Sequence, residues 1–361
     1  MSLTPLVGHE QVTRRIAESH AAGRLPQVLL ITGPRGVGRQ RLGLWIAQLI
    51  FCERPANGPC GNCRPCGLVA GLGHPDLHWF VPIPRPKAGD PDKQMDEAAE
   101  TLAELMTERR QQPLWTPPDG MALHGVASAR LLQRKAAMRP VEGQHSVILV
   151  GDAERLVPQE SSQEAANTLL KLLEEPPAGM TLILTAVEPG GVLPTIRSRA
   201  VPVRLGRLPD ATVAGFLREH AGVAEGIARE RARSAEGAIG RALAEDATSA
   251  KADQAAAGLL DAVLRGPSEA LELAVKQGPW QARGEFTAML DALARQLGDA
   301  ARVSASGPGV RPVTAALKRP RPVSALVAAI ERVQTARGAA QGNVNPQLLL
   351  AGLCADLAEV L

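Results

Sequence analysis

Aromatic residues are scarce in this sequence of 361 residues, which has four Phe, four Trp and no Tyr. Surfaces that bind single-stranded nucleic acid stack the bases on aromatic side chains, and this composition does not indicate such a surface. The net charge is only +3, so a strongly basic nucleic-acid-binding face is not indicated either. Leu, Val, Ile and Ala must fill the interior, which favours helices packed on a parallel sheet.

Long apolar runs are absent as well. No stretch approaches 18 uninterrupted apolar residues, so no membrane-spanning helix is predicted. The opening residues, MSLTPLVGHE, have neither the charged region nor the apolar region of a signal peptide, and we expect none.

Cysteines are few, and four of the five lie in the stretch CERPANGPCGNCRPC. Its thiols belong to Cys52, Cys60, Cys63 and Cys66, so two C-x-x-C steps share Cys63. Without a signal peptide, this spacing favours a tetrahedral structural zinc site, in which four thiolates leave no open position for catalysis. A redox pair or a disulfide is the alternative. The isolated Cys354 is expected to be a buried structural thiol.

The first part of the chain alternates helices with short apolar strands, which predicts an α/β fold with a parallel sheet. Helices are predicted in 9–23, 39–51, 126–140 and 161–177, and strands in 27–32, 145–151 and 180–187. Residues 192–205 are expected to lead out of the domain.

Residues 81–120 interrupt this alternation. The segment VPIPRPKAGDPDKQ predicts an extended loop, and 93–112 predict a polar helix, so we expect this insertion to lie outside the sheet. After residue 205 only helices are predicted. The expected domains are an α/β core (1–204), a small helical domain (205–248) and a larger helical domain (249–361).

The stretch GPRGVGRQ follows the first predicted strand and nearly matches the P-loop pattern G-x-x-x-x-G-K-[ST]. Gly33, Gly36 and Gly38 would let backbone N–H groups surround a phosphate. Arg39 stands in the place of the lysine that reaches the phosphates, and Gln40 in the place of the hydroxyl that holds Mg²⁺. These residues fit two interpretations, a nucleotide-binding site and a Gly-rich turn kept for packing.

The acidic residues at the end of the predicted strand VILVGDAE also differ from those of an ATPase. In ATPases of this kind an Asp that supports the metal is followed directly by a Glu that polarises water. Here Ala153 follows Asp152, and Glu154 comes one position late, where its side chain points elsewhere. Three parts of the hydrolysis machinery are missing together, so we expect that this chain is not required to hydrolyse ATP.

Two arginines in LPTIRSRA, Arg197 and Arg199, follow the last buried strand. An arginine in such a place can stabilise transition-state charge on the γ-phosphate of a neighbouring subunit. An ordinary surface arginine is the alternative.

Several of these motifs occur in one order in a known family. They are GHEQV, GRLPQVLLITGPRGVGRQRL, the four-cysteine loop, GHPDLHW, VILVGDAERL, EAANTLLKLLEEPPAGMTLILTAVEPGGVLPTIRSR and SAEGAIGRAL. In these motifs the chain resembles bacterial clamp-loader subunits, which are AAA+ proteins of DNA polymerase III. The resemblance covers residues 1 to about 245, apart from the insertion at 81–120. Its altered P-loop is similar to that of the delta-prime type, a stator, whereas the gamma/tau type is an ATPase motor.

The resemblance implies roles for individual residues. Arg199 would be the arginine finger for ATP bound by the adjacent motor subunit, although Ala200 stands where the family usually has Cys. Thr185 lies near a sensor position, where packing is its expected role, and Arg241 lies near a second sensor region, where its role is open.

The resemblance also implies partners and surroundings. They are gamma/tau and delta subunits in a hetero-pentamer, with the sliding clamp and primed DNA reached through the assembled complex in the cytoplasmic, nucleoid-associated replisome. The helices of 249–361 would form the collar that holds the ring, and 205–248 the lid. Structural zinc is the expected cofactor, and ATP binding is left open. A motor that uses Arg39 in place of lysine is the main alternative, and a zinc-containing DNA-binding adaptor is a further one.

Overall fold

The computed structural model describes residues 4–111, 122–156, 163–243, 247–276, 283–306, 317, 319, 321–340 and 344–361. The chain forms two compact units, Met1–Leu243 and Ala244–Leu361. Among the described helices, none combines the length and the apolar character that crossing a membrane requires.

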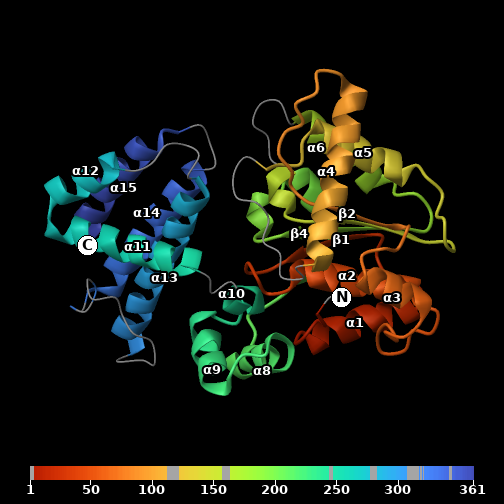
Figure 1. The fold of residues 1–361 in the computed structure, drawn as a ribbon, viewed down its shortest axis with the longest axis horizontal. Coiled ribbons are helices and arrows are strands. Elements are labelled where there is room, and N and C mark those ends of the chain that lie inside the picture. The colour runs from red at the N-terminus through yellow and green to blue at the C-terminus, as the bar shows by residue number, and fades with distance from the viewer. Residues whose placement is uncertain are drawn as a thin grey trace. The chain divides into compact units, whose positions relative to one another are not determined.

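A parallel sheet is the centre of the first unit (Figure 1). Its described strands have the order β2-β3-β4-β1-β5. The strands are β1 (Val28–Thr32), β2 (Leu77–Phe80), β3 (Ser146–Val150), β4 (Met180–Ala186) and β5 (Val201–Arg204). The carboxyl ends of parallel strands lie at one edge of a sheet, so residues that follow β1, β3 and β4 meet there.

Helices cover both faces of this sheet (Figure 1). They are α1 (Glu10–Ala21), α2 (Arg39–Phe51), α3 (Arg64–Ala70), α4 (Pro91–Gln111), α5 (Val126–Ala136), α6 (Gln163–Glu174) and α7 (Pro194–Arg197), with the 3₁₀ turns η1 (Ala153–Leu156) and η2 (Pro189–Gly191). Successive side chains of a strand point to opposite faces. In β1, Leu29 and Ile31 pack with α1 and α2, whereas Val28 and Leu30 pack with the layer that contains α4, α5 and α6.

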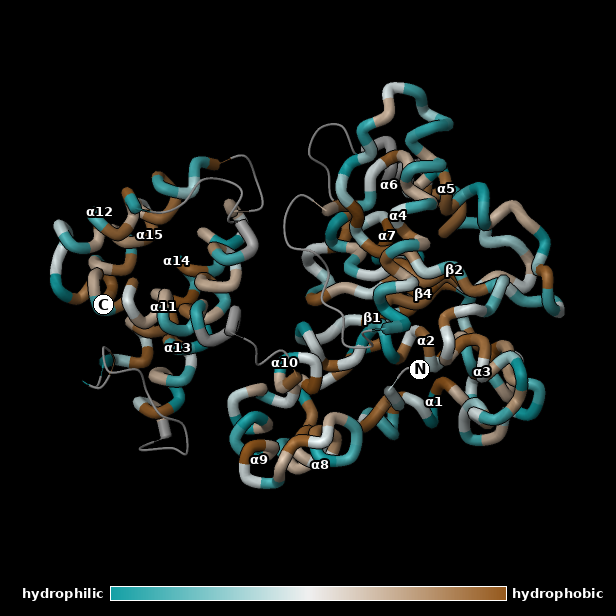
Figure 2. Tube along the Cα trace, in the orientation of Figure 1, coloured by the Kyte–Doolittle hydropathy of each residue, from teal (hydrophilic) through white to brown (hydrophobic). Residues whose placement is uncertain are grey.

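Burial on both faces explains why the central strands read as continuous apolar runs (Figure 2). The structure confirms the parallel α/β fold and these three strands. The two edge strands, β2 and β5, were missed, and residues 192–205 do not simply lead out of the domain. Val201–Arg204 pairs with β1 instead. Both edge strands are short and only partly buried, and β5 contains Pro202, which a sheet tolerates at its edge.

The insertion differs from its expected structure at its start. Helix α4 begins at Pro91, inside the predicted loop, because the Asp90 carboxylate accepts hydrogen bonds from the N–H groups of Asp92 (3.0 Å) and Lys93 (3.1 Å). The helix lies outside the sheet, as expected, but Ala98 and Leu102 are buried in the same core as β3 and β4. The insertion is thus a packed layer; residues 112–120 lie outside the described part.

Three further helices complete the first unit: α8 (Asp210–Ala221), α9 (Glu225–Ser234) and α10 (Ile239–Leu243). They have a small core of their own, with Val213, Leu217 and Ala228 fully buried. The second unit consists, in its described residues, of α11 (Ala247–Arg265), α12 (Pro267–Val275), α13 (Arg283–Ser306), α14 (Val323–Ala339) and α15 (Pro346–Val360). Cys354 is buried in the core of this unit. The division into three domains stays a prediction.

Candidate functional site

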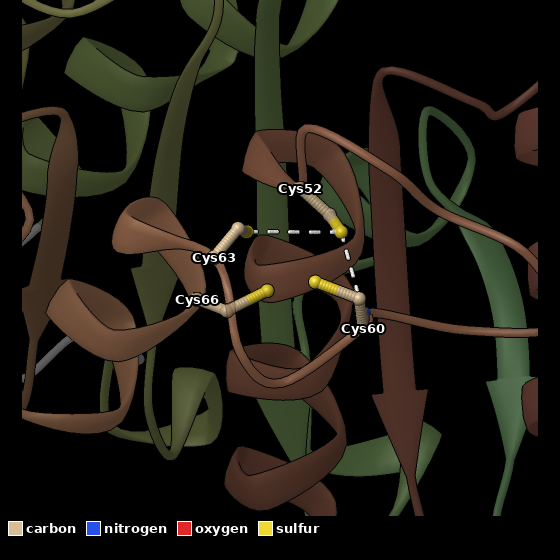
Figure 3. A group of neighbouring side chains, drawn as sticks. All are labelled: Cys52, Cys60, Cys63 and Cys66. Carbon is tan, nitrogen blue, oxygen red and sulfur yellow. Dashed lines mark hydrogen bonds between the residues drawn. The ribbon is translucent and has the colours of Figure 1, made fainter.

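Four cysteine side chains point toward one another beside α2 (Figure 3). Cys52 caps the end of α2, Cys63 caps the start of α3, and Cys66 lies in the first turn of α3. Gly61, whose φ of 75° favours glycine, makes the turn that brings Cys60 back to the group. The ligand atoms of the four residues all lie within 4.8 Å of one another. The arrangement could hold a metal ion.

The chemistry of this group fits a soft cation better than a disulfide. The Sγ atoms of Cys52 and Cys63 are 4.0 Å apart, about twice a disulfide bond length. Backbone N–H groups of Asn62 and Cys63 stabilise the Cys60 thiolate and lower its pKa to about 6. Burial raises the pKa of the Cys66 thiol, so a neighbouring cation is needed to keep that buried sulfur ionised.

Hydrogen bonds to a buried carboxylate and to α3 hold the segment after α5 in place. The Asp76 carboxylate, which is buried, accepts from the N–H groups of Val141 (2.6 Å) and Glu142 (2.7 Å). Glu142 in turn forms two hydrogen bonds, at 2.8 and 2.9 Å, with Arg64 in α3. Asp76, which directly precedes β2, thus holds Glu142 in the position from which it pairs with α3 of the cysteine group.

We expect Asp76→Ala to destabilise the first unit by about 1–3 kcal/mol, because two backbone donors lose their acceptor. Glu142→Gln is the matched control, since it weakens only an exposed ion pair, and it should destabilise the unit far less than Asp76→Ala does. Thermal unfolding of both variants checks this. Equal losses for the two variants would contradict the role of Asp76.

The P-loop segment connects β1 to α2, as the sequence predicted. Gly33, Gly36 and Gly38 have φ angles of 155°, 82° and 106°, which side-chain-bearing residues rarely adopt. A Cβ atom on Gly33 would lie 2.6 Å from the Leu205 carbonyl oxygen, so packing alone also requires this glycine. The carbonyl of Gly36 accepts a hydrogen bond from the N–H of Gly240 (2.9 Å), just inside α10. Backbone from α10 therefore covers this part of the loop.

The two substituted P-loop residues both contact the end of β3. Arg39 is 6% exposed, and its Nη2 lies 3.5 Å from Oδ1 of Asp152. Burial lowers the pKa of Arg39, and the Asp152 carboxylate opposes that shift. The Gln40 amide lies against Gly151, where an added Cβ would be 2.7 Å from its Nε2.

A third residue, which the sequence does not predict, lies beside the two substituted P-loop residues. Arg109, from the insertion helix α4, is 4% exposed, and its guanidinium lies 3.8 Å from the ring centroid of Trp79. Its Nη1 donates to Oε1 of Gln40 (3.4 Å). No sequence signal identifies Arg109, because it is 69 positions away from Gln40 and the sequence of α4 is typical of a polar surface helix.

These residues do not fit a bound Mg²⁺–ATP. In a P-loop enzyme a hydroxyl and a strand-end carboxylate hold the Mg²⁺. Here the carboxylate of Asp152 faces Arg39, and the amide of Gln40 takes the place of the hydroxyl. A divalent cation between these groups would meet guanidinium charge at close range.

The other predicted residues at this edge have structural contacts. Thr185 is fully buried, and its Oγ1 accepts from the N–H of Asp152 (3.1 Å). The carboxylate of Glu154 accepts from the N–H of Val187 (3.2 Å), and burial raises the pKa of Glu154. Arg241 forms an ion pair with Glu236 (3.1 Å). The roles proposed for Thr185 and Arg241 stay predictions.

Arg199 lies on the surface just after α7. Its side chain is 33% exposed and forms an ion pair with Glu174, at the end of α6, through Nε (2.9 Å) and Nη2. Nη1 donates to the Thr195 carbonyl (2.8 Å). The neighbouring Ala200 is buried in the core, which leaves room only for a small side chain. The guanidinium is therefore held at the surface, where another molecule can reach it.

Comparison with known proteins adds a family match over residues 8–209, to the family described as DNA polymerase III, delta subunit. A DNA polymerase III subunit gamma/tau of Mycobacterium tuberculosis is 29% identical over 219 residues, which is 60% of this chain and 30% of that protein.

Two relatives are named DNA polymerase III subunit delta'. The one from Pseudomonas aeruginosa is 33% identical over 174 residues, 48% of this chain and 40% of its own length. The one from Escherichia coli K12 is 27% identical over 231 residues, 64% of this chain and 57% of its own length. In each of these three comparisons the match spans less than two thirds of the relative's length.

Proposed function

The chain belongs to the DNA polymerase III delta subunit family, and on this premise we propose that it is a delta-prime-type subunit of a clamp loader. In this role it is a stator that helps to load the sliding clamp onto primed DNA. It does not hydrolyse ATP itself, and it supplies an arginine to the ATPase site of a neighbouring subunit. The parallel α/β unit then corresponds to an AAA+ domain.

The P-loop residues are the observation that distinguishes a stator from a gamma/tau-type motor. Relatives of both kinds match the chain, so identity alone does not separate them. The contact of Arg39 with Asp152 supports the stator, because a motor needs that carboxylate for its metal. The position of Gln40 against Gly151 supports it as well, because the amide cannot replace the small hydroxyl that binds Mg²⁺.

The arginine supplied in trans is Arg199. Its exposure and its contacts with Glu174 and Thr195 support this role, since a finger must be both accessible and held in place. In the transition state its charge would stabilise the γ-phosphate of ATP bound by the adjacent subunit.

The proposed cofactor is structural Zn²⁺, held by Cys52, Cys60, Cys63 and Cys66. Four thiolates saturate tetrahedral zinc, so the ion supports the fold of the segment between α2 and α3 and takes no part in a reaction. Partners in the proposed assembly are gamma/tau and delta subunits, with the clamp and primed DNA reached through the complex. The lid (205–248) and the collar (249–361) are part of the same proposal.

ATP turnover by the purified chain tests this function. We expect no turnover above background, with or without primed DNA. An Arg39→Ala variant prepared in the same way is the control for contaminating ATPase, because background hydrolysis would be identical in both preparations. Clear turnover that Arg39→Ala abolishes would instead establish a motor that uses arginine in place of lysine.

A further inference from the structure

We propose that the insertion helix α4 closes the Mg²⁺ end of the P-loop with Arg109, so that the chain's own guanidinium groups occupy the place of the metal. The insertion thereby has a role that the stator function does not require. The barrier to Mg²⁺–ATP is the packed arginine, in addition to the substitutions at Arg39 and Gln40.

The contacts of Arg109 place it in the core of the site. Its guanidinium lies over the face of Trp79 at 3.8 Å, in the geometry of a cation–π contact. One edge of the same group reaches the amide oxygen of Gln40 at 3.4 Å. Gln40 in turn lies against Gly151, the residue before Asp152. Helix α4, the start of α2 and the end of β3 are thus connected through the buried Arg109 and the half-buried Gln40.

Electrostatics supports this assignment. A buried cation is costly unless opposite charge lies close to it. Among the described groups, the carboxylates of Asp152 and Glu108 both favour the charged form of Arg109. Burial lowers the pKa of Arg109 to about 9, so the group stays charged at neutral pH. Arg39 forms an ion pair with Asp152, and the charge of the same carboxylate acts on Arg109. Two guanidinium groups thus lie in the field of the carboxylate that would otherwise serve a metal.

The helix that carries Arg109 is anchored along its length. Asp90 caps its first turn, and the Glu97 carboxylate accepts from the N–H groups of Lys87 and Ala88. Ala98 and Leu102 are buried against the core. Arg109 therefore reaches the site from a rigid element.

Reconstruction of the P-loop tests the proposal. The variant Arg39→Lys/Gln40→Thr restores the lysine and the hydroxyl, and two further variants add Arg109→Ala or Arg110→Ala to it. Arg110 is the matched control, because it is the adjacent arginine and lies exposed, with its Nη2 on the Leu72 carbonyl. Equilibrium binding of ATP is measured with Mg²⁺ and with EDTA on each full-length chain.

We expect replacement of Arg109 to raise the Mg²⁺-dependent affinity for ATP at least about tenfold above that of the double variant, a free-energy difference of about 1.4 kcal/mol. The variant with Arg110→Ala should bind no better than the double variant. Equal binding by the double variant and the Arg109 variant would overturn the proposal, and so would the absence of binding in both.

Loss of the buried arginine can also unfold the chain, so circular dichroism and thermal unfolding are measured on every variant. If Arg109→Ala does not fold, Arg109→Met replaces it, because methionine keeps an apolar stem against Trp79. Turnover by the unaltered chain tests the stator function separately, so failure of either idea is recognised on its own.

Discussion

Replacing Arg199 with alanine is expected to lower ATP turnover at the adjacent motor site by about 10³-fold, the contribution typical of an arginine finger. The reason is that transition-state charge on the γ-phosphate loses the guanidinium proposed to stabilise it. The effect is measured as DNA-stimulated ATPase of the assembled clamp loader. Assembly itself, followed by size-exclusion chromatography, should be unchanged because Arg199 is an exposed side chain that packs in no core.

Two variants control this experiment. Arg197→Ala removes a nearby exposed arginine and should leave turnover intact. Glu174→Gln weakens the ion pair that holds Arg199 without removing the guanidinium, so turnover should fall far less than in Arg199→Ala. Unchanged turnover in Arg199→Ala, or loss of the assembly, would refute the finger role.

Removal of zinc is expected to have the largest effect on stability. Without the cation, the buried thiols of Cys63 and Cys66 lose the interaction that brings α2 and α3 together. If the site contributes several kcal/mol, the melting temperature of the first unit should fall by roughly 10 °C, at about 2–4 °C for each kcal/mol. Differential scanning calorimetry before and after chelation measures the change, and atomic emission should find one zinc per chain.

Single variants separate the metal from the thiols. Cys66→Ser should lose the zinc and show the same fall in melting temperature as chelation. Cys354→Ala is the matched control, because this buried thiol lies in the second unit and should leave the zinc content unchanged. A chelated protein that keeps its full melting temperature would contradict a structural metal site.

The features predicted well from sequence are those set by residues close together in the chain. The cysteines lie between positions 52 and 66, so their spacing alone constrains them to one group. The glycines of the P-loop and the runs that form β1, β3 and β4 are local in the same sense. Their burial on both faces produces a continuous apolar pattern, which is read directly.

The edge strands were harder to predict. β2 and β5 have one neighbour each in the sheet and only part of their surface buried, so their composition is mixed. The start of α4 was misplaced for another reason. The Pro-rich composition around Pro91 predicts a loop, whereas Asp90 and Pro91 together form a helix N-terminus.

The cysteine group, the central strands and the presence of Arg39 and Gln40 in the P-loop pattern are properties of the local sequence. The contacts that these two side chains make depend on the packing of distant elements. Arg109 meets Gln40 across 69 positions, and Arg39 meets Asp152 across 113. Contacts of that kind depend on how whole helices pack on the sheet, and local periodicity carries no information about them.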